Sequence, residues 1–159
     1  MSHKLRTNLI LLITIGLLAV VVWWSQPAPI IPLSQLLPHQ ITRITISGPS
    51  RESINMTLSG DQWLVEDRPG LSSRIKQLLE ICQTPSLNHF PAPAELNQFG
   101  LDRPDLVLQL NQEQFLFGIT DPINGWRYIL HRGEVHLIGN GFQHHLIAPI
   151  EAWQENPDA

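Results

Sequence analysis

An unbroken apolar run from Leu9 to Trp24 (LILLITIGLLAVVVWW) constrains this chain more than any other part of its sequence. As a helix rising about 1.5 Å per residue, the run spans about 24 Å. The flanking Thr7, Asn8 and Ser25 bring the length near the roughly 30 Å hydrocarbon core of a bilayer. The run therefore predicts a transmembrane anchor over residues 9–25.

The charges on either side of the run are unequal. Lys4 and Arg6 precede it, whereas the first charge after it is Arg43. Because positive residues are retained in the cytoplasm, we expect a single-pass protein with its N-terminus inside and its remainder exported. The competing interpretation is a cleaved secretory signal, which needs small residues before the scissile bond. The exit here, WWSQPAPIIP, is a poor cleavage site, and both interpretations export the remainder.

Proline dominates the segment that follows the run. Residues 26–38 contain four prolines and no charge, a composition that favours stiff, extended backbone. The apolar residues of this segment are expected to pack on the domain or to lie along the membrane interface. The predicted organisation is a cytoplasmic N-terminus (1–8), a transmembrane anchor (9–25), a proline-rich tether (26–38) and one exported domain (39–159).

Charge and cysteine content exclude several classes of protein. Ten Lys and Arg stand against fourteen Asp and Glu, a formal net charge of −4, and every acidic residue lies beyond residue 40. Such a surface does not favour nucleic acid, whose binding depends on basic contacts to phosphate. Cys82 is the sole cysteine, so no intramolecular disulfide forms, and its place on an apolar helix face predicts a buried, inert thiol.

Alternating apolar residues predict two antiparallel β-meanders separated by a helix. Trp63 and Trp126 each follow a polar, glycine-containing turn, so the two halves look loosely alike and a duplication is conceivable. Both tryptophans are expected in the core. The predicted strands are 41–47, 53–58, 63–65, 87–90, 106–110, 114–119, 126–131 and 134–138, and the amphipathic helix covers 71–82.

The segment FGLDRP is predicted to form a structural corner. Gly100 can adopt the left-handed conformation of a Schellman cap, in which Leu101 contacts Leu96. Pro104 then prevents the helical turn from continuing. Asp102 is accordingly interpreted as a turn residue and not as a catalytic acid.

These features together resemble a known family. The apolar anchor, the ITRITI strand, the turn into QWLV, the amphipathic helix, the LNQFGLDRP corner and the VLQL and FLFGI strands are similar to DUF4340 proteins, which are membrane-anchored bacterial envelope proteins. The GLDRP corner is the most specific part. The resemblance implies an α+β domain without established catalytic residues, in the periplasm and held at the inner membrane. Some relatives are associated with ABC-type export or gliding systems, and this chain is shorter than many of them.

The residues best placed for chemistry are His131, Glu134 and His136. If Arg132 and Gly133 form a two-residue hairpin loop, these three side chains share one face, where zinc ligands could converge. The alternative is that Tyr128, Leu130, Val135 and Leu137 form the buried face, so that the histidines simply face water. His144 and His145 would point about 100° apart on a helix and make a poor ligand pair.

Three functions remain open. The first is a non-catalytic module at the inner membrane that binds an envelope protein, as an accessory subunit of an envelope or transport-associated complex. The second is a domain that binds a small molecule or metal on the last hairpin, and the third is a hydrolase built from scattered residues. The sequence contains none of the common catalytic motifs, so we assign no catalytic, cofactor-binding or metal-binding residue and expect no enzyme activity.

Overall fold

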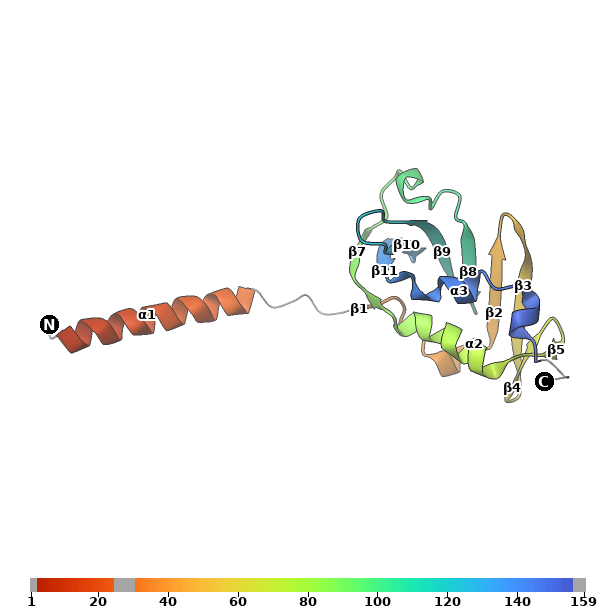
Figure 1. The fold of residues 1–159 in the computed structure, drawn as a ribbon, viewed down its shortest axis with the longest axis horizontal. Coiled ribbons are helices and arrows are strands. Elements are labelled where there is room, and N and C mark those ends of the chain that lie inside the picture. The colour runs from red at the N-terminus through yellow and green to blue at the C-terminus, as the bar shows by residue number, and fades with distance from the viewer. Residues whose placement is uncertain (1–2, 25–30, 156–159) are drawn as a thin grey trace.

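The computed structural model describes residues 3–24 and 31–155, and its elements are labelled in Figure 1. The α-helices are α1 (His3–Trp24), α2 (Ser72–Leu79) and α3 (Gln143–Leu146). The strands are β1 (Ile31–Pro32), β2 (Arg43–Gly48), β3 (Arg51–Ser59), β4 (Gln62–Val65), β5 (Arg68–Pro69), β6 (Pro85–Ser86), β7 (Asn88–Pro91), β8 (Leu106–Leu110), β9 (Glu113–Thr120), β10 (Arg127–His131) and β11 (Glu134–Ile138). Short 3₁₀ helices are η1 (Pro38–Gln40), η2 (Glu80–Gln83), η3 (Asn97–Phe99), η4 (Asn140–Phe142) and η5 (Ile150–Trp153).

Nine of these strands form one antiparallel sheet in the order β5-β4-β3-β2-β8-β9-β10-β11-β7. The predicted meanders are the two halves of this sheet. They are joined by β2 and β8, which place Ile44 opposite Leu110 and Ile46 opposite Leu108. The alternating pattern correctly predicted the individual strands, but it did not indicate that the two halves would share a single sheet.

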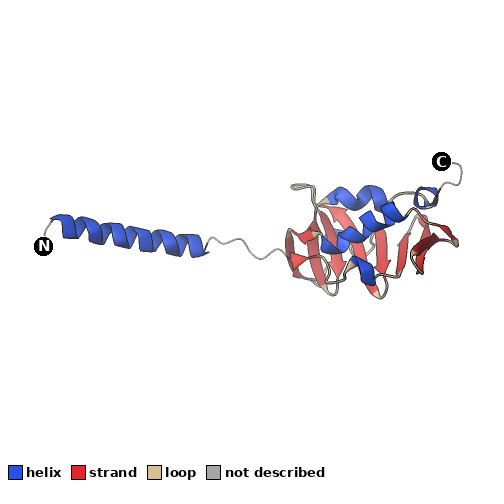
Figure 2. Cartoon of the chain, turned by 90° about the horizontal axis from the view of Figure 1, so that it is seen from below, coloured by secondary structure: helices blue, strands red, loops and turns tan. Residues whose placement is uncertain are grey.

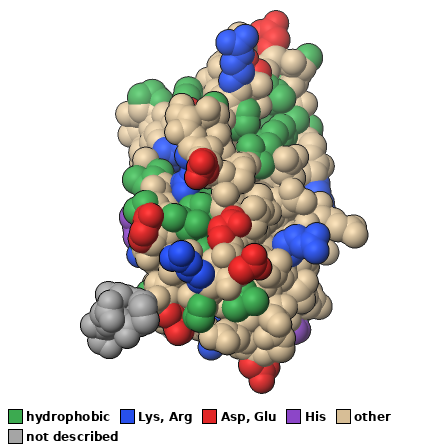
Figure 3. Space-filling model, turned by 90° about the vertical axis from the view of Figure 1, so that its right-hand side faces the viewer, with side chains coloured by type: hydrophobic (Ala, Val, Ile, Leu, Met, Phe, Trp, Pro, Cys, Tyr) green, Lys and Arg blue, Asp and Glu red, His purple; other side chains and the backbone are tan. Residues whose placement is uncertain are grey.

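Helices α2 and α3 lie over one face of the sheet, as Figure 2 shows. This arrangement gives the domain two layers, with the apolar side chains between them. At the end of the domain formed by β3, β4 and β5, Figure 3 shows acidic and basic side chains interspersed over the surface. That end therefore lacks the continuous basic surface that contacts to phosphate require.

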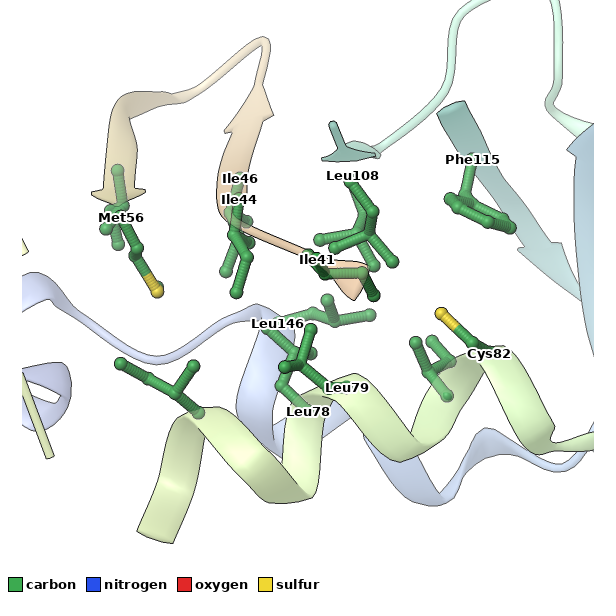
Figure 4. Close-up of a cluster of buried hydrophobic side chains, with 14 of the residues drawn as sticks. Ile41, Ile44, Ile46, Met56, Leu78, Leu79, Cys82, Leu108, Phe115 and Leu146 are labelled. Carbon is green, nitrogen blue, oxygen red and sulfur yellow. The ribbon is translucent and has the colours of Figure 1, made fainter. Parts of the chain in front are cut away.

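The core fills the space between the sheet and α2 (Figure 4). Met56, Leu108 and Phe115 point from the strands towards Leu78 and Cys82 on the helical layer, and all five are completely buried. Burying one such large apolar side chain contributes about 1.5–3 kcal/mol of transfer free energy. The contact between the two layers is therefore the main source of stability.

The amphipathic helix is shorter than the sequence indicated. The α-helix ends at Leu79, and the chain continues as a 3₁₀ helix that contains Cys82. The helix begins at Ser72, but the N-cap position belongs to Leu71, which makes no side-chain capping hydrogen bond. The predicted apolar stripe is confirmed, because Ile75 and the apolar residues that follow it on the same helix face are buried.

The predicted fold class, an α+β domain with one main amphipathic helix behind a transmembrane helix, is wrong. The described chain is mostly antiparallel β-sheet, and α2 and α3 have only eight and four residues. The physical reason is the pairing of β2 with β8. It merges both meanders into one wide sheet whose apolar face short helical segments can cover.

The predicted membrane anchor at 9–25 is also wrong. Among the described residues, no helix is long and apolar enough to cross a membrane. The predicted single-pass topology, with an inner-membrane location and a periplasmic domain, is corrected with it.

Part of the predicted tether, 26–38, belongs to the domain. Residues 26–30 lie outside the described residues, but from Ile31 onwards the chain packs against the fold. Leu33 is buried, and the N–H groups of Leu33 and Ser34 donate hydrogen bonds to carbonyl oxygens of η2 and its C-cap. The packed domain therefore begins within the predicted tether.

The FGLDRP corner has the predicted cap. Gly100 has a φ of 65°, and its N–H donates to the carbonyl of Asn97 over 3.0 Å. The N–H of Leu101 donates to the carbonyl of Leu96 over 3.1 Å. These are the two hydrogen bonds of a Schellman motif, so the local prediction is confirmed.

Replacement of Trp63 tests where the core lies. Both tryptophans were expected in the core. Trp63 is buried, but Trp126 is only half-buried. Trp63→Ala should lower the free energy of unfolding by about 3–5 kcal/mol, because it removes buried apolar surface and leaves a cavity. Urea denaturation followed by circular dichroism measures the change. The adjacent exposed variant Gln62→Ala should change it by less than about 0.5 kcal/mol, and equal losses in both would contradict this placement.

Candidate functional site

The candidate residues lie on the β10–β11 hairpin, whose register is as predicted. His131 lies opposite Glu134, and Ile129 lies opposite His136. The loop residues Arg132 and Gly133 have φ angles of 47° and 80°, the positive values that a type I′ turn requires. His131, Glu134 and His136 therefore share one face of the hairpin.

That face does not point to water. His131 and His136 are only 5% and 4% exposed, so the prediction of solvent-facing histidines is wrong. The ring of Phe115 stacks on His131, with the ring centroids 4.1 Å apart. Both histidines therefore belong to the inner face of the sheet.

The opposite face of the hairpin is covered by the FGLDRP corner. The ring of Phe99 lies 4.9 Å from that of Tyr128 and 5.5 Å from that of Phe90. A Cβ atom on Gly118 would come within 2.1 Å of the carbonyl oxygen of Phe99, so glycine is what permits this close approach. Val135 is consequently buried as well. A strand covered on both sides gives no alternation from which its inner face could be predicted.

Glu113 is the centre of a polar cluster beside His131. Its Oε2 atom accepts a hydrogen bond from the Ser34 hydroxyl over 2.9 Å and lies 3.0 Å from Nε2 of His131. Arg132 donates to Oε1. One carboxylate thus joins the β1 segment, β9 and the β10–β11 turn through charge-assisted hydrogen bonds. The sequence analysis missed Glu113 because it lay in a predicted turn without any motif.

Both ring nitrogens of His131 are already engaged. Nδ1 lies 3.0 Å from the carbonyl oxygen of Gln114, which can only accept, so Nδ1 carries a proton. Nε2 faces the carboxylate of Glu113. A metal ion could reach either nitrogen only by displacing one of these two oxygen atoms.

His136 has a different arrangement. Its Nδ1 lies 3.1 Å from the Ser86 hydroxyl, which donates to the carbonyl of Asn88 over 2.9 Å. Nδ1 of His136 is therefore the donor to Ser86. Its Nε2 lies 3.8 Å from the Glu134 carboxylate, beyond hydrogen-bond distance.

The remaining candidates occupy other places in the fold. Within the described part of the chain, no three His, Cys, Asp or Glu side chains are placed to hold a metal ion. The rings of His144 and His145 lie 3.9 Å apart, so the two side chains do not diverge as predicted. His145 is buried and His144 is exposed. Burial, then the charge of Glu113, raises the pKa of Cys82 to about 12, so its reactive thiolate is absent at neutral pH. Asp102 lies in a bend of the corner, in keeping with its interpretation as a turn residue, and it is exposed.

A groove of about 1080 Å³ crosses one end of the sheet beside the Glu113 cluster. It runs from β2 and β3, past the β8–β9 turn, to the turn of the last hairpin. Its lining includes Arg43, Thr57, Gln112, Gln114, Leu116 and Leu130. The sequence held no signal for this groove, because its walls come from strands that are distant along the chain.

Comparison with known proteins finds no relative: no family model, no curated protein and no solved structure matches this chain.

The pH dependence of stability tests the state of His136. Burial lowers the pKa of His136 below its ordinary 6.5, the charge of Glu134 opposes this shift, and His131 and His89 add to it. As the pH falls below about 6.5, the unfolded chain takes up a proton before the folded chain does, so stability decreases. The stabilisation is complete above that pH and is lost as the pH falls through the folded pKa. His136→Asn keeps a donor towards Ser86 but does not titrate.

The free energy of unfolding of His136→Asn should therefore fall less than that of the parent between pH 7 and pH 5. Urea denaturation at pH 7, 6 and 5 measures the two slopes. His39→Asn, at an exposed position, is the control and should follow the parent. A parental slope in His136→Asn would contradict the assignment.

Proposed function

We propose that this chain is a non-catalytic binding module, an accessory subunit that binds a partner protein through the groove. The observation that carries the proposal is the groove itself, in which polar side chains surround the half-buried Leu116 and Leu130. Protein interfaces combine apolar contacts with a polar rim in the same way. At about 1080 Å³ the groove is larger than most small-molecule pockets, which occupy about 300–1,000 Å³.

The side chains along the groove are available to a partner. Arg43, Gln112 and Gln114 make no side-chain hydrogen bond or ion pair with any residue in the described ranges. They can therefore form hydrogen bonds with another chain without breaking any inside the fold. Glu113 and Arg132, by contrast, neutralise one another and hold the shape of the groove at one end.

The geometry of the polar cluster supports a non-catalytic role. Ser34, Glu113 and His131 are the residue types of a hydrolase triad, but Ser34 hydrogen-bonds the carboxylate and not the histidine. A triad needs the histidine between the other two, as the base that accepts the hydroxyl proton. His131 is also occupied by Gln114. His131 is a poor ligand for the alternative metal site for the same reason, because its ring nitrogens already face Gln114 and Glu113.

The charge of the chain favours a protein partner over nucleic acid. The net charge is −4, and Arg43 is the cation of the groove that no carboxylate neutralises among the described residues. Binding to a phosphate backbone needs several such cations. The resemblance to DUF4340 proteins, carried by the corner at 96–104, supports an accessory role in a transport-associated complex and is part of this proposal.

Site-specific photo-crosslinking in the native cell tests the proposal. A photoreactive amino acid at Gln112 or Gln114, which line the groove, should capture the same partner protein. Matched positions at Gln62 and Gln77 are also exposed glutamines but lie on β4 and α2. They should not capture that partner.

A second variant separates the groove from the rest of the surface. Leu116→Asp places a charge in the groove wall and should abolish capture from Gln114, while circular dichroism verifies that the domain is folded. Capture of the same partner from all four glutamine positions, undiminished capture in Leu116→Asp, or no capture from the groove would each overturn the proposal.

A further inference from the structure

A second, smaller pocket lies at the opposite end of the same strands. The last hairpin ends at the groove with His131 and Glu134, whereas Arg127 and Ile138 occupy its other end. There a pocket of about 210 Å³ opens between the inner face of the sheet and the η4–α3 segment. It shares no lining residue with the groove.

Most of the wall of this pocket is apolar. Leu106, Phe117 and Leu146 are buried around it, and Phe142 is half-buried. Ile147, which also lines it, is 62% exposed. An exposed large apolar side chain next to a concave apolar surface is typical of a ligand site.

Arg127 supplies the charge in the pocket. Its side chain is 14% exposed and is held by two neutral acceptors: Nε donates to Oδ1 of Asn140 over 2.9 Å, and Nη1 donates to the carbonyl of Gly118 over 2.8 Å. The nearest carboxylate, Asp105, is 4.0 Å away and is itself 71% exposed. The guanidinium is therefore fixed in position without an anion in hydrogen-bond contact.

One donor atom of Arg127 remains free for a ligand. Nη2 has no hydrogen-bond partner among the described residues. It is also not among the fully buried side-chain nitrogen atoms of the described residues that lack a hydrogen-bond partner, so a ligand can reach it. Burial lowers the pKa of Arg127, and Asp105 opposes this shift, because a largely buried cation without a close counterion is unfavourable.

We propose that this pocket binds a small apolar carboxylate, with the carboxylate on Arg127 and the hydrocarbon part between Phe117, Phe142 and Leu146. An oxygen anion on Nη2 forms a charge-assisted hydrogen bond and supplies the missing counterion. A pocket of about 210 Å³ holds about seven groups of the size of a water molecule, at roughly 30 Å³ each. The carboxylate takes about two of these, which leaves a hydrocarbon part of about five carbons, as in hexanoate. This site is separate from the groove and goes beyond the protein-binding function proposed for it.

Calorimetric titration of the full chain with sodium hexanoate is the direct test. We expect hexanoate to bind, and 1-hexanol and hexylammonium chloride to bind at least tenfold more weakly, because neither provides an anion for Arg127. Equal affinity for hexanol would show an apolar cavity without carboxylate recognition and would overturn the proposal. Absence of hexanoate binding would overturn it too.

Two glycines provide a matched pair of variants. Gly139 lines the pocket and has extended backbone angles of −60° and 142°, and a Cβ atom there meets nothing within 4 Å. Gly141 offers the same open space but does not line the pocket. Gly139→Leu should weaken hexanoate binding at least tenfold, and Gly141→Leu should leave it unchanged. Equal binding in both variants would contradict the location of the site.

The charged residues give an independent test. Arg127→Gln should weaken hexanoate binding at least tenfold and remove the preference over hexanol. If that variant does not fold, Asp105→Asn decides, because Asp105 is exposed and competes for the same guanidinium. Asp105→Asn should tighten binding severalfold, whereas unchanged or weaker binding would count against recognition by Arg127. Crosslinking from Gln114 should be unaffected by Gly139→Leu, so this proposal and the proposed function fail separately.

Discussion

The antiparallel pairing of β2 with β8 is the contact on which the rest of the domain depends. It joins the half formed by β5, β4, β3 and β2 to the half formed by β8, β9, β10, β11 and β7. When β2 and β8 pair, Ile46 and Leu108 become neighbours on one continuous inner face, which α2 and η2 then cover. The groove also depends on this pairing, because β2 and β9 reach it from opposite sides of β8.

The polar cluster around Glu113, of which Arg132 is the exposed member, is the second organising contact. It ties the segment before β2, through Ser34, to the last hairpin, through His131 and Arg132. Buried polar groups stabilise a unique arrangement when every donor and acceptor is paired, and they destabilise the fold when one partner is missing. The cluster therefore specifies where the hairpin sits relative to the start of the domain, and it shapes the wall of the groove at the same time.

The two candidate sites differ in the chemistry of their cations. Arg132 is exposed and paired with Glu113 at the groove, so it contributes shape and little net charge. Arg127 is largely buried and held by neutral oxygen atoms, so its charge is directed at the pocket. The same hairpin thus presents an open, mixed surface at one end and a small, charged apolar pocket at the other. The proposed protein-binding groove and the proposed carboxylate pocket therefore lie at opposite ends of one hairpin and share no lining residue.

The sequence by itself determined the local features of this protein: the alternating strands, the register of the last hairpin from Arg132 and Gly133, and the Schellman cap at Gly100. Only the tertiary structure decided that the meanders form one sheet, that His131 and His136 lie inside, and that Glu113 and Arg127 are the charged groups at the two sites. The apolar run at 9–25 was likewise misinterpreted from local composition. The physical reason is range: turns, caps and periodicity arise from neighbouring residues, whereas burial and the partner of a charge depend on segments that are distant along the chain.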